Sequence, residues 1–142
     1  MSKSGRYSAD RKKIEEISAA TVNVEQHDCG TIFVINNGSQ VQTVNLPTVA
    51  AAGKGWWCKF IYSAGSGDVT IAQDSSDTAN IVRSIFICAN SSGSVQSPAS
   101  DGVKFDVSAC FAGDTVELLT DGSHWYAQAI TSGSLAVLKH DA

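Results

Sequence analysis

The sequence predicts a single all-β domain, a β-sandwich or barrel of about nine or ten short strands behind an N-terminal arm. Short runs rich in β-branched and aromatic residues, such as TIFVIN at 31–36 and TVELLT at 115–120, recur along the chain. Clusters of Gly, Ser, Asp and Asn separate these runs, as is typical of sandwiches and barrels. The 142 residues are 43% hydrophobic and 17% charged, which fits one domain with a substantial core.

The expected strands follow one another directly, without a second domain or an internal repeat. They are the runs at 21–25, 31–36, 41–46, 55–63, 68–72, 80–89, 103–107, 115–120, 124–130 and 134–138. Turn signals such as Asn37-Gly38 end several of them. The longest polar stretch, 89–102, is expected to form a mobile loop.

The run GWWCKFIYS at 55–63 shows how the strands should divide between two faces. Alternation places one set of side chains toward the core: Trp56, Cys58, Phe60 and Tyr62. The opposite face carries Trp57, Lys59 and Ile61, and it meets either a second packed layer or another subunit.

The N-terminal segment differs from the rest in pattern and charge. Residues 8–18 have helical character, with Ser8 as a candidate N-cap and Ile14 and Ile17 three positions apart. A helix this short is marginal alone, so the arm is expected to be extended or short-helical. The predicted division is therefore a basic arm at 1–20 and a β-sandwich domain at 21–142.

Charge is distributed unevenly along the chain. Residues 1–20 carry five basic and three acidic side chains, whereas residues 21–142 carry five basic and eleven acidic ones. A basic tail on an acidic body can dock on an acidic surface. The body has no basic stripe, so nucleic acid is not an expected partner. No apolar run reaches the length of about 18 residues that a membrane span needs, and the polar start is no secretory signal, so synthesis in a cytoplasm is expected.

No residue cluster indicates catalysis or a bound cofactor. The cysteines Cys29, Cys58, Cys88 and Cys110 lack the close pairs of zinc sites, and they are expected to be buried free thiols. The histidines His27, His124 and His140 show no metal-ligand spacing. No serine sits in a nucleophile elbow, and the Gly-rich segments lack phosphate-binding motifs. The protein is therefore not expected to be an enzyme.

The stretch TVELLTDGSHWYAQAI at 115–130 holds the densest group of reactive side chains. Asp121-Gly122 predicts a two-residue type I′ hairpin that pairs Leu118 with Trp125 and Val116 with Ala127. One face then forms core: Val116, Leu118, Trp125 and Ala127. The other face is mixed: Glu117, Leu119, His124, Tyr126 and Gln128. The acidic and aromatic groups are thus divided between faces and do not converge on one site.

Taken in order, several motifs resemble those of small phage virion proteins. They are CGTIFVINN (29–37), VNLPTVAAAG (44–53), WWCKFIY (56–62), GDVTI (67–71) and GDTVELLTDGSHWY (113–126). The chain resembles the head decoration (cement) proteins of tailed phages over about residues 21–130. The resemblance implies a compact β-sandwich or jelly-roll-like barrel. It also implies a homotrimer on the capsid exterior, with an N-terminal arm that crosses onto neighbouring subunits.

The resulting expectation is a structural virion protein that binds the major capsid protein and itself, without cofactor, nucleic acid or membrane. Candidate docking residues lie in the arm: Arg6, Tyr7, Arg11, Lys12, Lys13, Ile14 and Ile17. Trp57 and Tyr126 are candidate subunit contacts. The alternative is a β-module of a head fibre or tail protein, in which Trp57, Tyr126 and the 89–102 loop contact host glycans.

Overall fold

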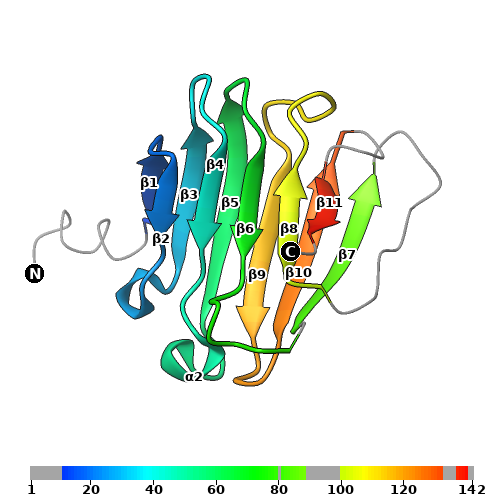
Figure 1. Ribbon diagram of the computed structural model, residues 1–142. Helices are drawn as coiled ribbons and strands as arrows, with labels where there is room; N and C mark the ends of the chain where they lie inside the picture. The colour runs from blue at the N-terminus through cyan, green and yellow to red at the C-terminus, as the bar shows by residue number, and fades with distance from the viewer. Residues whose placement is uncertain (1–10, 80, 89–99, 133–136, 141–142) are drawn as a thin grey trace, which may run out of the picture.

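Two β-sheets pack face to face around one hydrophobic core (Figure 1). The computed structural model describes residues 11–79, 81–88, 100–132 and 137–140. These residues form eleven strands, one 3-10 turn, η1 (Gln26–Asp28), and one short helix, α2 (Val49–Ala52). The predicted all-β sandwich is confirmed, with one strand more than the upper end of the expectation.

The strands divide six to five between the sheets. The six-stranded sheet has the order β1 (Lys13–Ile17), β3 (Thr31–Asn36), β5 (Trp57–Ala64), β9 (Thr115–Thr120), β10 (Trp125–Thr131), β7 (Val82–Cys88). The five-stranded sheet has the order β11 (Val137–His140), β8 (Gly102–Phe105), β6 (Val69–Ala72), β4 (Gln42–Asn45), β2 (Thr21–Asn23). Residues 89–99 of the predicted loop lie outside the described residues, and β8 begins at the last residue of that stretch.

The chain winds back and forth between the sheets from β1 to β8. As a result, β1, β3 and β5 are parallel neighbours in one sheet, and β2, β4 and β6 are parallel neighbours in the other. Antiparallel pairing enters with β9, which joins β5 to β10, and with β8, which joins β6 to β11. Jelly rolls are antiparallel, so this mixed topology departs from the jelly-roll-like alternative while keeping the two-layer sandwich.

β1 lies inside the segment that the sequence analysis assigns to the arm. It pairs in parallel with β3, Lys13 beside Thr31 and Ile17 beside Ile35. The helical alternative is therefore wrong for these residues, and the extended one holds. Ile17 fills the core, with 4% of its surface exposed, so burial of one side chain outweighs a weak helical period. Residues 1–10 lie outside the described part of the chain.

Alternation along β5 places side chains as predicted. Trp56, Cys58, Phe60 and Tyr62 are each at most 5% exposed, whereas Trp57 and its neighbours on the opposite face are half-buried. Burial raises the pKa of the Cys58 thiol well above its usual value.

The prediction of buried thiols holds for Cys58 but not for every cysteine. Cys29 is exposed and Cys110 is half-buried, so the prediction is wrong for Cys29. Cys29 follows η1, in the turn that precedes the buried start of β3. Its position in a surface turn, outside any strand, explains why this cysteine is exposed.

The hairpin between β9 and β10 keeps its predicted faces but not its predicted register. Trp125 pairs with Thr120 and Ala127 with Leu118, so four residues rather than two form the loop. Gly122 has a φ of +94°, and no residue other than glycine has a positive φ among those described, which excludes a type I′ turn at Asp121. The register is shifted by two residues. Side chains along a strand return to the same face every two residues, so the core side chains still face the core: Val116, Leu118, Trp125 and Ala127.

An ion pair joins β8 to the turn before β6. Lys104 Nζ lies 2.8 Å from Asp68 Oδ2, and the Val107 N–H donates to Asp68 Oδ1 at 3.0 Å. The Lys104 contact, followed by the Val107 hydrogen bond, lowers the pKa of Asp68, and the same contact raises the pKa of Lys104. A carboxylate with a depressed folded pKa stabilises the protein above its unfolded pKa of about 4. That stability is lost as the pH falls through the folded pKa.

We therefore expect Lys104→Met to lower the free energy of unfolding at pH 7, with a difference from the wild type that shrinks as the pH falls below about 4. Urea unfolding followed by circular dichroism at several pH values measures this. Lys54→Met, at an exposed turn, is the matched control. If the difference in unfolding free energy between variant and wild type stayed constant down to the lowest pH tested, the ion pair between Lys104 and Asp68 would not be its cause.

Candidate functional site

The most unusual surface of the protein is the side of the six-stranded sheet that points away from the core. We call it the outer face. Along each strand its side chains alternate with those on the side that faces the other sheet. They are Ile14, Glu16, Ile32, Val34, Trp57, Lys59, Ile61, Thr115, Glu117, Leu119, Tyr126, Gln128, Ile130, Arg83, Ile85 and Ile87.

The outer face exposes large apolar side chains. Eight large hydrophobic residues in the described part of the chain are exposed, and six of these lie on this face. They are Ile14 (65%), Ile130 (57%), Ile85 (52%), Ile87 (48%), Leu119 (46%) and Tyr126 (45%). Single exposed hydrophobic residues are common on soluble proteins, but a group of this size on one sheet face marks an interaction surface.

Strand register places opposite charges side by side at the centre of this face. One row crosses all six strands in the order Ile14, Ile32, Lys59, Glu117, Gln128, Ile85. Lys59 in β5 pairs directly with Glu117 in β9, the two central strands. The row therefore has an isoleucine at each end and a basic–acidic pair in the middle.

Two shallow hollows lie on the face, one on each side of Glu117 and Leu119. The larger, about 570 Å³, is lined mainly by Arg83, Ile85, Leu119, Tyr126 and Gln128. The smaller, about 330 Å³, lies between Lys12, Trp57 and Lys59. The predicted contact residues Tyr126 and Trp57 thus line separate hollows, and both hollows belong to the same sheet face.

Tyr126 is held in place at the end of the hairpin by Asp121. The tyrosine hydroxyl donates to Asp121 Oδ2 at 2.9 Å, and the Ser123 and His124 N–H groups donate to Asp121 Oδ1 at 2.8 Å each. The backbone hydrogen bonds from His124 and Ser123, then the one from Tyr126, lower the pKa of Asp121 to about 2. The Asp-Gly pair predicts a turn at this aspartate, whereas its hydrogen bond to Tyr126 has no signal in the sequence.

The arm residues that are described have different environments. Arg11, Lys12 and Ile14 are exposed and available for docking. Ile17 is buried in the core, so its predicted role as a docking anchor is wrong. Arg6 and Tyr7 lie outside the described residues.

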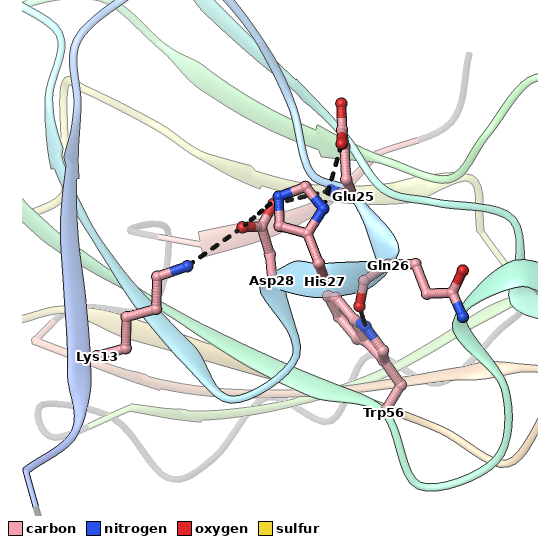
Figure 2. A network of polar contacts seen from close by, with 6 residues as sticks. All are labelled: Lys13, Glu25, Gln26, His27, Asp28 and Trp56. Carbon is pink, nitrogen blue, oxygen red and sulfur yellow. Dashed lines mark hydrogen bonds and ion pairs between the residues drawn. The ribbon is translucent and has the colours of Figure 1, made fainter. Parts of the chain in front are cut away.

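Lys13 is tied to its own chain by a polar network (Figure 2). Its Nζ lies 3.5 Å from Asp28 Oδ1, and His27 lies between Glu25 and Asp28, at 3.3 and 3.7 Å. The neighbouring Gln26 carbonyl accepts a hydrogen bond from Trp56 Nε1 at 2.8 Å. The network fastens β1 to the η1 turn and to a core tryptophan, so Lys13 supports the fold at this edge.

Several outer-face residues could not be predicted from the sequence, because they lie in continuous apolar runs. In β7, for example, VRSIFIC buries Val82 and Phe86 and exposes Ile85 and Ile87. Both sets are apolar, so hydrophobicity alone could not tell which set faced the core. Alternation around the core tryptophans Trp56 and Trp125 did predict the outer-face residues of β5, β9 and β10, among them the contact candidates Trp57 and Tyr126.

A third hollow, about 680 Å³, is polar and lies on the other side of the sandwich, near Asn23, Asn45, Asp74, Asp77 and Asp101. Within the described residues, no group of three His, Cys, Asp or Glu side chains is arranged to hold a metal ion. No helix in the described ranges is long and apolar enough to cross a membrane.

Compared with known protein families and with curated proteins, the sequence of this chain matches none.

Proposed function

We propose that this protein is a structural virion component, a capsid decoration protein that binds the outer surface of a phage head as a homotrimer and stabilises it. The observation that carries the proposal is the outer face, where six large apolar side chains are 45–65% exposed on a rigid sheet. Such a surface serves assembly, because its binding energy comes from burying area. The resemblance of its motifs to those of cement proteins supports a location on a capsid.

The basic segment before β1 suits attachment to the shell. Residues 1–20 carry a net charge of +2 and the remainder a net charge of −6, so a neighbouring acidic surface attracts the arm and repels the body. Arg11 and Lys12 are exposed at the start of the described chain. Several arms in one oligomer engage the lattice together, and this multivalency strengthens modest single contacts.

Deletion of residues 1–12, which also removes the exposed Arg11 and Lys12, is the experiment that tests the docking role. This deletion keeps β1 and the buried Ile17, whereas a longer one to residue 18 would remove a core residue and unfold the sheet edge. We expect occupancy on heads that lack the protein to fall by at least about tenfold, because arm contacts are lost at every subunit. Occupancy is measured from the protein content of purified heads.

Two controls separate docking from folding. The truncated protein should keep the unfolding midpoint and oligomer mass of the full chain. Lys54→Glu changes an exposed charge on the body and should leave occupancy unchanged. Full occupancy by the truncated protein would remove the arm from the docking mechanism.

A second candidate function is a β-module of a head fibre or tail protein that binds host glycans. The hollow of about 570 Å³ on the outer face favours this function, since Tyr126 lies there beside Arg83, Glu117 and Gln128. Aromatic and polar groups together can bind a sugar. A glycan array distinguishes the two functions: binding that Trp57→Ala and Tyr126→Ala abolish would favour the fibre module. The predicted contribution of the 89–102 loop concerns residues that mostly lie outside the described ranges.

A further inference from the structure

We infer that the outer face is covered by a second copy of this chain, with the half on β1, β3 and β5 packed against the half on β9, β10 and β7 of the neighbour. The inference rests on the proposed function, because it assigns the self-association that an oligomeric decoration protein needs. It goes further in naming the surface, the two halves that meet and the residue pairs that lie opposite each other.

The central charges are complementary to those of a second copy. Lys59 and Glu117 occupy the two middle strands at the same height in the sheet. A rotation axis that runs parallel to the strands, between β5 and β9, brings Lys59 toward Glu117 of the neighbour, and Glu117 toward the neighbour's Lys59. This holds for a two-fold pair and for a three-fold ring. A partner surface of one charge sign would match one of these residues and repel the other.

The apolar residues match under the same rotation. Ile14 and Ile85 stand at opposite ends of the central row, so each lies opposite the other residue in the neighbouring copy. Trp57 pairs with Leu119 across β5 and β9, and the two therefore also meet between copies. Exposed isoleucine, leucine and tryptophan are then covered by apolar surface.

The size of the face suits a specific interface. Six strands at a spacing of about 4.8 Å span about 24 Å, and strands of this length extend about 20 Å. In a two-fold pair, two such faces offer about 1,000 Å² in projection, and their accessible area is larger, which reaches the range of specific interfaces. A three-fold ring buries the same face but divides it between two neighbours. The charged pair at the centre fixes the register between copies.

The first test is the mass of the purified full chain over a range of concentrations, by light scattering or native mass spectrometry. We expect the wild type to be oligomeric and Ile85→Lys to weaken association by more than about tenfold, because it places a charge in an apolar contact. Val41→Lys is the matched control: Val41 is 67% exposed but precedes β4 in the other sheet. It should leave the mass unchanged.

The second test uses charge reversal in separate chains. Lys59→Glu and Glu117→Lys should each weaken association. An equimolar mixture of the two should restore it at both contacts of a two-fold pair, and at two of the three contacts of a three-fold ring. Since Lys59 and Glu117 are also neighbours within one chain, a double variant could recover through either contact. Mixing recovers only through contact between chains.

The outcomes separate this inference from the proposed function. A wild type that stays monomeric at high concentration, or Ile85→Lys with unchanged mass, overturns the inference. A monomeric wild type whose glycan or head binding is lost in Ile85→Lys also overturns it and assigns the face to that partner. Self-association through the face without any binding to heads supports the inference and refutes the capsid role.

Discussion

Replacement of Trp125 by alanine is expected to lower the free energy of unfolding by about 3–5 kcal/mol. Trp125 is fully buried at the start of β10, and its ring meets Trp56 edge to face, with centroids 5.5 Å apart. Alanine would leave a cavity between the sheets and remove this aromatic contact. Urea unfolding followed by circular dichroism, at one protein concentration, measures the loss.

Two further variants distinguish packing from surface effects. The indole N–H of Trp125 has no hydrogen-bond partner among the residues that the structure describes. Trp125→Phe should therefore cost much less than Trp125→Ala, because it keeps an aromatic ring and removes an unpaired buried donor. Trp57→Ala should cost less than Trp125→Ala in the isolated chain, because Trp57 is only half-buried on the outer face. Equal losses for both tryptophans would contradict the assignment of Trp125 to the core.

Replacement of Gly102 by alanine is expected to destabilise the protein by about 2–3 kcal/mol. Gly102 is buried in β8, and a Cβ there would collide with the backbone carbonyl of Ile71 in the adjacent β6. The clash is with backbone, so the strands must separate locally. Val103 and Phe105, both fully buried in β8, would move with them.

Gly38→Ala is the control for the glycine replacement. Gly38 has a φ of +59°, and a Cβ there would meet no atom within 4 Å. Its cost is expected to be about 1–2 kcal/mol, from the left-handed backbone alone. If unfolding in urea showed that Gly102→Ala costs less than Gly38→Ala, the close contact between β6 and β8 would be excluded.

Alternation in the sequence was enough to find the two faces of β5, β9 and β10. Trp56, Phe60 and Trp125 were all assigned to the core, and all are at most 4% exposed. The register of the last hairpin could not be found in the same way. Asp121 accepts hydrogen bonds from Ser123, His124 and Tyr126, and these side-chain contacts favour a four-residue loop over the tight turn that Asp-Gly predicts.

Parallel pairing and the role of β1 depended on contacts that a single sequence does not display. KIEEI carries isoleucines at helical spacing, and only the neighbouring β3 strand and the core position of Ile17 make it a strand. The outer face was found in part, through Trp57 and Tyr126. Its isoleucines in β7 needed the structure, because in an apolar run either set of alternate residues can be the buried one.

The winding of β1 to β6 has a consequence for the order of folding. In this half, paired strands lie close in the sequence, as with Lys13 and Thr31 or Thr21 and Thr43. Pairing of β5 with β9 joins Trp57 to Leu119, a far longer stretch of chain. Each doubling of a closed loop costs about 0.6 kcal/mol more in chain entropy, and local contacts form faster than distant ones. We therefore expect the sheets formed by β1 to β6 to fold first, and β9 and β10 to pair with β5 afterwards.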